Sequence, residues 1–281
     1  MKKSLITLSI ILSIILFSCQ KESGFSLAPG SGSGSSTGSG LLSRLVSKAG
    51  SDSSVLAFGY NSSKKLITFN ITNYSGGSVS AIQEKAVRDA QGIIQKVILK
   101  SDLYQQAGFD SVVTKVHYSS ARYTSKVTSF DFSVIILKDS VALAYDGTGK
   151  VITERSFADD GSNAYEEYQK VEYTYSGNNI ATIKTYSYDS GTSSYTLEQT
   201  YSYDQFDAKI SPLYFGNDAF FFDSPFFVST NNPLKSTLTA TGSPAQVYTT
   251  TYTYNSSNKP LTATSTIQPG NATTTATYYY Q

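Results

Sequence analysis

Residues 171 to 204 read VEYTYSGNNIATIKTYSYDSGTSSYTLEQTYSYD, and they contain three tyrosine pairs whose members lie two positions apart: Tyr173/Tyr175, Tyr186/Tyr188 and Tyr201/Tyr203. Side chains two positions apart in an extended chain project to the same face, so Val171, Tyr173 and Tyr175 share one face of a strand. Four more apolar residues share one face by the same alternation: Tyr195, Leu197, Tyr201 and Tyr203. The stretch therefore predicts antiparallel hairpins with one tyrosine-rich face, separated by the turn sequences SGNN and DSG.

Similar turn chemistry recurs along the chain. The recurring segments are FGYNSSKKLITF from Phe58, RDAQGIIQKVILK from Arg88, AYDGTGKVITE from Ala144, YTYSGNNIATI from Tyr173 and YTYNSSNKPLTA from Tyr252. Asp and Asn bind their own backbone and tolerate left-handed conformations, and Gly adopts positive φ without strain, so each segment predicts a tight reversal. Their spacing is irregular, which indicates a family of hairpins rather than a solenoid.

Composition favours strands throughout residues 41–281. The chain has 22 Tyr and 15 Phe but a single Met, and runs of helix formers are scarce. Strands of about nine residues and turns of about four give on the order of 15 to 18 strands, and an open sheet of that width does not stay flat. We therefore predict an all-β fold: one large curved antiparallel sheet, half-barrel or closed barrel, built from consecutive hairpins.

Two segments need separate treatment. Residues 81–100 contain good helix formers, but Gly92 interrupts them and RDAQG matches the YDGTG turn, so we expect strand, turn and strand. Residues 206–233 contain three prolines together with Phe215, Phe220, Phe221, Phe222, Phe226 and Phe227. Proline does not suit a central strand, and this many Phe side chains do not suit a free loop, so the segment should fold back and cover one end of the sheet.

The N-terminus has the form of a lipoprotein signal peptide. Residues 1–18 carry two lysines and the apolar run LITLSIILSIILF, and LFSC resembles a lipobox that would place lipid on Cys19. Residues 19–40 then form a Gly/Ser-rich tether, which predicts a reach on the order of 25 Å. We expect an outer-membrane lipid anchor, with the domain at the cell surface or, alternatively, facing the periplasm.

The inventory of chemical groups is small. With 22 basic and 21 acidic residues the chain has no field that favours nucleic acid, and one Cys allows neither an internal disulfide nor a thiolate cluster. His117 is the single histidine and is read as a packing residue, so neither a metal nor a cofactor is predicted. The carboxylate pairs Glu166/Glu167 and Asp204/Asp207 leave open the alternative that the protein is a hydrolase. The segment 159–163 is read as a hairpin loop rather than a Ca²⁺ site.

Several of these segments together resemble a known group of proteins. They are YDGTGKV from Tyr145, YSYD from Tyr201, the Pro212/Phe215 aromatic stretch and NNP from Asn231 ahead of YTYNSSNKPLTA. The combination is similar to lipoproteins of the Bacteroidota with YD/RHS-like β-hairpin repeats and a porin-like or half-barrel sheet. That resemblance implies a fold and an envelope location, and it implies no catalytic residues.

These features favour a non-enzymatic binding or scaffold lipoprotein. Its expected partners are the membrane, through the lipid, and a glycan, peptide or protein ligand. The candidate ligand-contact aromatics are Tyr214, Phe215, Phe220, Phe221 and Phe222. We expect a monomer. Three alternatives remain open at this point: a carboxylate-dependent hydrolase, a carrier of a hydrophobic ligand inside a half-barrel, and a barrel that spans the membrane.

Overall fold

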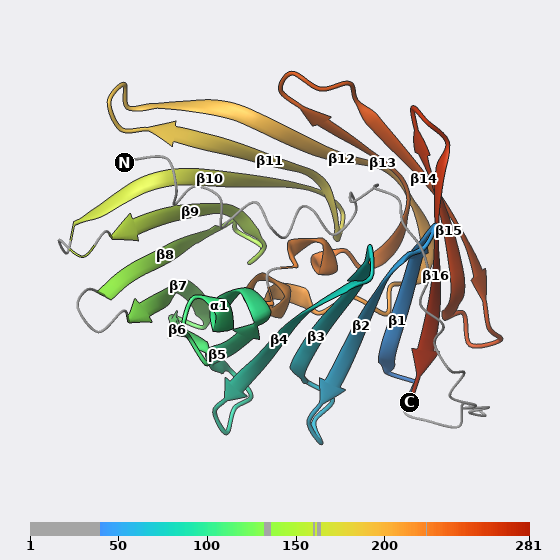
Figure 1. The fold of residues 1–281 in the computed structure, drawn as a ribbon, viewed down its shortest axis with the longest axis horizontal. Helices are drawn as coiled ribbons and strands as arrows, with labels where there is room; N and C mark the ends of the chain where they lie inside the picture. The colour runs from blue at the N-terminus through green and yellow to red at the C-terminus, as the bar shows by residue number, and fades with distance from the viewer. Residues whose placement is uncertain (1–39, 132–135, 160, 162–163, 223) are drawn as a thin grey trace.

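The chain folds into a closed barrel of sixteen antiparallel strands (Figure 1). The structure is a computed structural model that describes residues 40–131, 136–159, 161, 164–222 and 224–281. The predicted signal peptide, Cys19 and nearly all of the predicted tether therefore lie outside the described residues. Each strand pairs with the next, and β1 closes the ring on β16 through pairs such as Leu42 with Tyr280. The predicted all-β sheet of consecutive hairpins is confirmed, and closure selects the barrel over the half-barrel.

The sixteen strands are short, apart from β12. They are β1 (Leu42–Ala49), β2 (Asp52–Tyr60), β3 (Leu66–Ser75), β4 (Ser78–Arg88), β5 (Ile94–Ser101), β6 (Val112–Ser119), β7 (Arg122–Asp131), β8 (Ile136–Tyr145), β9 (Val151–Asp159), β10 (Tyr165–Ser176), β11 (Asn179–Asp189), β12 (Ser194–Ile210), β13 (Asn231–Ala240), β14 (Gln246–Tyr254), β15 (Pro260–Gln268) and β16 (Ala272–Tyr280). β4 and β5 confirm the strands predicted within residues 81–100. The helix α1 (Asp102–Gln106) joins β5 to β6. No helix among the described residues is long and apolar enough to cross a membrane.

Four of the five predicted turns share one hydrogen-bonding scheme. The side-chain oxygen of the leading Asn or Asp accepts N–H groups from the residues two and four positions later; the leading residues are Asn61, Asp89, Asp146 and Asn255. The fourth residue of each turn has positive φ; these residues are Lys64, Gly92, Gly149 and Asn258. The fifth turn is tighter, because Ser176 pairs with Asn179 across Gly177 and Asn178. Local Asx chemistry thus builds one end of the barrel.

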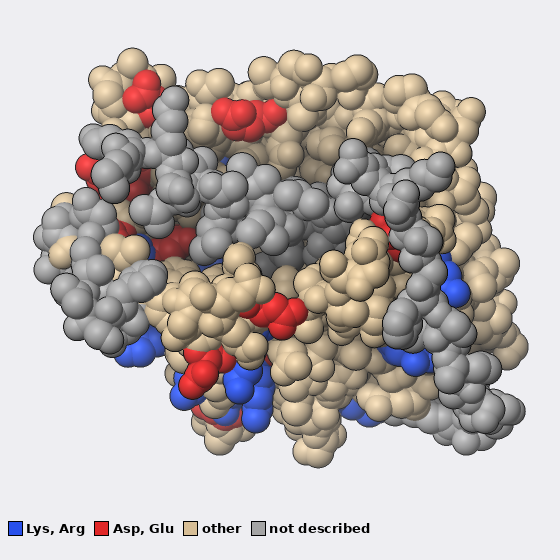
Figure 2. Space-filling view, in the orientation of Figure 1, with Lys and Arg blue, Asp and Glu red and all other residues tan. Residues whose placement is uncertain are grey.

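The outer face of the barrel is mostly polar on three strands, β14, β15 and β16. On β14, β15 and β16 the outward positions form a threonine lattice, with Thr251 paired to Thr264 and Thr264 to Thr275, while Tyr252 and Ala263 point inward. Figure 2 shows, from one side, that acidic and basic residues occur in small separate groups among uncharged residues. On these three strands alternation therefore places apolar residues inside and mainly threonine hydroxyl groups outside.

One register shift corrects the predicted arrangement of the tyrosines. β11 and β12 pair Thr185 with Gln199 but Tyr186 with Leu197, so Glu198 is an extra residue in β12. A β-bulge of this kind reverses which face the following side chains occupy. The buried Tyr201 faces the interior as predicted, but Tyr195 and Leu197 face outward, which makes the prediction of one common face for these residues wrong. Tyr186 and Tyr188 lie outside with them, whereas Tyr173 and Tyr175 point inward.

The segment between β12 and β13 folds into the barrel and closes one end, as predicted. It contains two 3-10 helices, η2 (Gly216–Phe221) and η3 (Pro225–Val228), which lie inside the ring of strands in Figure 1. We call residues 211–230 the plug and this end of the barrel the plugged end. The expectation that the three prolines of residues 206–233 lie outside strands is wrong for Pro233. This residue lies within β13, at an irregular pairing with Phe206. A bulge tolerates proline because it lacks a regular ladder hydrogen bond there.

Candidate binding groove at the plugged end

The plug is held by a buried ion pair. The Arg88 guanidinium, with a side chain only 4% exposed, lies 2.9 Å from the Asp218 carboxylate of η2. Arg88 also donates to the carbonyl oxygens of Leu66 and Gly92, and the Tyr123 hydroxyl donates to the second Asp218 oxygen at 3.1 Å. Burial, followed by the nearby Asp218 charge, raises the pKa of Tyr123. Two strands, β4 and β7, are therefore joined to the plug through one carboxylate.

Further polar contacts fix the plug on its other sides. The Lys126 ammonium donates to the Phe220 carbonyl oxygen at 2.9 Å, and the Asn217 side-chain amide donates to the Gly149 carbonyl at 3.2 Å. The Ser229 hydroxyl accepts the Ile180 N–H at 3.1 Å. These contacts satisfy backbone groups that closure of the barrel buries, and they give the plug one position.

The structure separates the five aromatic residues predicted to contact ligand. Phe220, Phe221 and Phe222 are between 1% and 4% exposed and pack on Tyr173, Tyr123 and Phe69, respectively, so a ligand outside the barrel does not reach them. Phe215 is partly buried against Phe58 and Phe227. Tyr214 alone among the five is well exposed, at 47%. Its role as a ligand contact stays a prediction.

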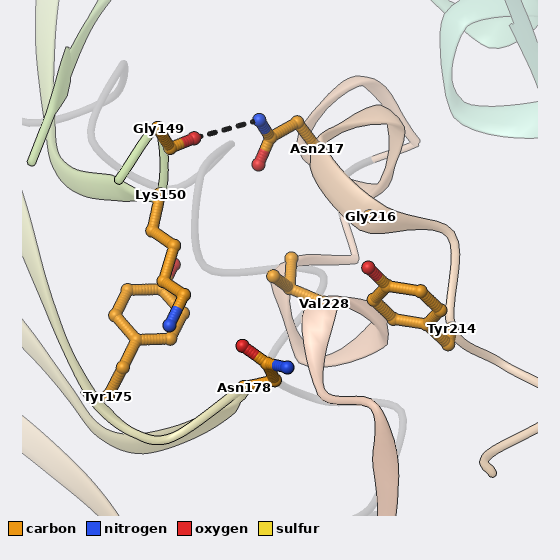
Figure 3. Close-up of a pocket in the computed structure, with 8 residues that line it drawn as sticks. All are labelled: Gly149, Lys150, Tyr175, Asn178, Tyr214, Gly216, Asn217 and Val228. Carbon is orange, nitrogen blue, oxygen red and sulfur yellow. Dashed lines mark hydrogen bonds between the residues drawn. The ribbon is translucent and has the colours of Figure 1, made fainter. Parts of the chain in front are cut away.

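Tyr214 lines one of two adjacent pockets at this end. The first pocket has a volume of about 230 Å³ and lies between the plug and the turns that follow β8 and β10 (Figure 3). Figure 3 shows Lys150, Asn178, Asn217 and Tyr214 around it, with Val228 between them. The side chains thus converge from three separate segments of the chain.

The second pocket, of about 300 Å³, shares Gly149 and Asn217 with the first, so the two lie side by side. Its other walls come from the turns after β2 and β4, the β6–β7 hairpin and the plug: Lys65, Gln91, Gly92, Ile93, Tyr118, Ala121, Arg122, Tyr123 and Asp218. We call the two pockets together the plug groove.

The plug groove carries more positive than negative charge. Lys65, Arg122 and Lys150 line it, whereas its lining carboxylate, Asp218, is already engaged by Arg88 and Tyr123. Lys150 donates to the Gly177 carbonyl at 2.5 Å and lies 5.3 Å from the centre of the Tyr175 ring. Such contacts hold the ammonium group in place without neutralising it.

Inward tyrosines at this end donate to the backbone of the preceding strand. Tyr60, Tyr175, Tyr252 and Tyr280 bind the carbonyl oxygens of Leu42, Val151, Pro233 and Pro260. Tyr145 departs from this scheme, because its buried hydroxyl has no hydrogen-bond partner among the described residues. Burial raises its pKa to about 12, and Arg122 lies over its ring at 5.5 Å. Tyr145 is therefore a polar group beneath one wall of the groove that makes no hydrogen bond there.

Three of the four carboxylates considered for hydrolysis have partners, and the fourth, Glu166, is exposed. Arg155 and Tyr195 both donate to Glu167, while Asn232 and Tyr254 donate to Asp207. Asp204 lies 3.8 Å from Lys235. These contacts explain the acidic residues as parts of structural networks.

The remaining candidates lie apart from the groove. His117 is exposed on the outer face of β6, so its interpretation as a packing residue is wrong; an outward strand position leaves it in water. In segment 159–163 the Gly161 N–H donates to Asp159, as a hairpin loop requires, while residues 160, 162 and 163 lie outside the described residues. Among the described residues no cluster of His, Cys, Asp and Glu has the arrangement of a metal site.

Sequence reasoning missed most of the groove. Lys150, Asn178 and Asn217 occur in turn or plug segments that were singled out for their backbone chemistry, not for their side chains. The turn signal places Gly149 and Lys150 at a hairpin end but does not say which other turn lies next to them. Only closure of the barrel brings these segments together.

The chain matches no protein-family profile and no curated protein sequence. Among solved structures, it is similar to a porin-like protein from Bacteroides uniformis, with a TM-score of 0.53, 10% identity, and coverage of 85% of this chain and 96% of that one. It is also similar to a porin-like protein from Bacteroides vulgatus, with a TM-score of 0.52, 11% identity, and coverage of 86% and 99%. At this identity the likeness shows the fold alone. The resemblance predicted from the sequence is confirmed for the porin-like barrel, while the YD/RHS repeat and the lipoprotein character stay predictions.

Proposed function

We propose that this protein is a lipid-anchored, non-enzymatic binding module of the outer membrane whose barrel stands in water and does not conduct solutes. The anchor is the lipidated Cys19, and the ligand is a glycan, peptide or partner protein. The protein acts as a monomer. The surface and the periplasmic side of the membrane are the two places that such an anchor permits.

The single observation that carries this proposal is the polarity of the barrel. A membrane-spanning barrel presents an apolar band to lipid, whereas here the outer positions of β14 to β16 are mainly threonine. The apolar side chains instead pack around the plug, as Phe69 does against Phe222 and Phe227. A barrel with hydroxyl groups outside and a packed plug inside suits water better than lipid.

The first described residue, Gly40, lies where a lipid-anchored tether could join the barrel. Gly40 donates its N–H to the Gln281 carbonyl at 2.7 Å, beside the first residues of β1 at the plugged end. A lipid on Cys19 would therefore attach at the end that carries the plug groove. The groove would face the region close to the membrane surface.

Two measurements test the proposal. Cells making the full chain are labelled with an alkyne fatty acid and fractionated; the wild-type protein should carry label in the outer membrane, and Cys19→Ala should carry none. The purified lipoprotein is then added to planar lipid bilayers, where it should produce no single-channel steps. Stepwise conductance by the wild-type protein, or stable outer-membrane insertion of Cys19→Ala, would overturn the proposal. Protease treatment of intact cells separates surface display from a periplasmic location.

A further inference from the structure

We propose that the plug groove binds an acidic carbohydrate chain, with its carboxylate or sulfate groups on Lys65, Arg122 and Lys150. This inference rests on the proposed function, because it names the ligand class of the binding module. It concerns the two adjacent pockets and no other part of the barrel.

The charge of the groove points to an anion. None of Lys65, Arg122 and Lys150 forms an ion pair with a carboxylate of the described residues, although each lines the groove. The carboxylates nearest in the turns, Asp89 and Asp146, each accept several hydrogen bonds from their own turn. Arg in particular binds carboxylate and sulfate oxygens in a bidentate manner. An acidic ligand would supply the oxygen acceptors that the groove lacks.

The neutral lining points to a sugar. Tyr214 and Tyr118, 47% and 40% exposed, contribute one aromatic side chain to each pocket. Between and beside them lie the amides of Asn178, Asn217 and Gln91. A sugar ring presents apolar C–H faces that pack on aromatic rings and hydroxyl groups that bind amides, so it uses both kinds of group. The amide of Asn217 already donates to Gly149, which fixes its position for an incoming ligand.

The shape of the site disfavours an acidic peptide. Extended peptides commonly bind by adding a strand to an open sheet edge, and closure of β1 on β16 leaves no such edge. Helical peptides need a continuous apolar groove, but Val228 and Ile93 are the only aliphatic side chains larger than alanine in the lining of the two described pockets. A flat, hydroxylated chain that crosses from one pocket to the next fits the lining better.

The groove is also preorganised. Its walls include the turns begun by Asp89 and Asp146, whose side chains hold the backbone through paired N–H groups. The plug wall is fixed by the Arg88 pair with Asp218. A ligand therefore does not have to order these loops, which favours binding of a weakly apolar molecule.

The test uses the purified lipidated protein and two ligands that differ only in charge. Binding of a galacturonic acid tetramer is measured by isothermal titration calorimetry beside the same tetramer with its carboxylates methyl-esterified. The acidic tetramer should bind at least about tenfold more tightly, and raising the salt from about 50 mM to about 500 mM should weaken it, since exposed charges are screened. A chondroitin sulfate tetrasaccharide is measured as a third, sulfated ligand. Equal affinity for the two tetramers would overturn the inference. So would a failure of all three ligands to bind.

Matched variants locate the site. Tyr214→Ala and Arg122→Gln should each weaken binding by about fivefold or more. Their controls should change affinity less than twofold: Tyr165→Ala removes a tyrosine of similar exposure, 44%, and Arg44→Gln removes another exposed arginine that lies over a tyrosine ring. Unchanged binding by both groove variants would contradict the assignment. Thermal melting of each variant confirms that the barrel is intact, and Lys150→Gln provides a second groove variant if one of them unfolds.

The source of the sugar is decided by a vesicle experiment. Vesicles carrying a sialylated glycolipid are compared with vesicles of phosphatidylglycerol that contain no sugar. Because the lipid anchor inserts into both kinds of vesicle, the binding compared is the part that is lost in Tyr214→Ala. Binding to the glycolipid in the same way as to the soluble tetramer supports the inference and shows that membrane-attached glycans are accepted. Equal binding to phosphatidylglycerol would contradict it, because charge alone would then suffice. A negative result in the carbohydrate-binding tests would not change the lipid-labelling and conductance results that test the proposed function. The two proposals can therefore fail separately.

Discussion

The Tyr175 hydroxyl donates a 2.7 Å hydrogen bond to the carbonyl oxygen of Val151, which is completely buried at the start of β9. The same contact recurs at the plugged end in three other pairs of neighbouring strands, and it explains why tyrosine rather than phenylalanine ends these inward rows. The ring fills the core beside the plug, and its hydroxyl satisfies a carbonyl group that water does not reach.

Replacing Tyr175 with Phe should therefore lower the free energy of unfolding by about 1 to 2 kcal/mol, because the Val151 carbonyl loses its side-chain donor. Tyr145→Phe is the matched control. Its hydroxyl has no partner among the described residues, so its removal should be neutral or slightly stabilising. Urea unfolding followed by circular dichroism gives both values, and equal losses for the two variants would contradict the hydrogen-bond explanation.

The ion pair between Arg88 and Asp218 should be a large single contribution to plug stability. Asp218→Ala leaves the buried guanidinium without its counter-charge and should cost about 3 kcal/mol. The exposed pair of Lys235 and Asp204, at 3.8 Å, supplies the control, and Asp204→Ala should change stability by less than about 0.5 kcal/mol. Chemical denaturation measures both, and a small effect of Asp218→Ala would show that the plug is held by packing alone.

Stability should depend on pH through Glu167. The hydrogen bond from Arg155 holds the pKa of this carboxyl below its usual range, with a smaller contribution from Tyr195. A depressed folded pKa means that the stabilisation is present above the unfolded value of about 4.3 and is lost as pH falls through the lower folded value. Because Arg155 is half exposed, the effect should be about 1 kcal/mol or less.

Glu167→Gln should reduce the loss of stability between pH 7 and about pH 3, as measured by unfolding at both values. Glu166→Gln, at the neighbouring exposed position, should retain the wild-type pH dependence. If Glu167→Gln loses as much stability on acidification as the wild-type protein does, the pair of Glu167 with Arg155 is not the cause of that loss.

The direction of the strand faces can be tested on adjacent residues of β15. Thr264 points outward and Ala263 inward, so Thr264→Lys should change stability by less than about 0.5 kcal/mol while Ala263→Lys should prevent folding. In a barrel whose outer face contacts lipid, lysine at an outward mid-strand position would cost about 2 to 4 kcal/mol. Yield of folded protein and thermal melting distinguish these outcomes, and failure of Thr264→Lys to fold would indicate a buried or lipid-facing outer surface.

The sequence by itself determined the parts of this protein that depend on neighbours in the chain. Alternation in residues such as Tyr173 and Tyr175 specifies a strand, and a leading Asn or Asp with a left-handed residue three positions later specifies a turn, because both act over a few bonds. The aromatic and proline content of residues 206–233 likewise indicated a cap on the sheet.

Only the tertiary structure decided which hairpins meet and which face each tyrosine occupies. Closure pairs Leu42 with Tyr280, from opposite ends of the domain, and no local pattern encodes that contact. The extra residue Glu198 carries no distinguishing chemistry, yet it reverses the face of Tyr195 relative to Tyr201. The plug groove exists because the plug folds back into the barrel and places Asn217 beside the turns at Gly92 and Gly149, so its physical origin is long-range contact rather than sequence pattern.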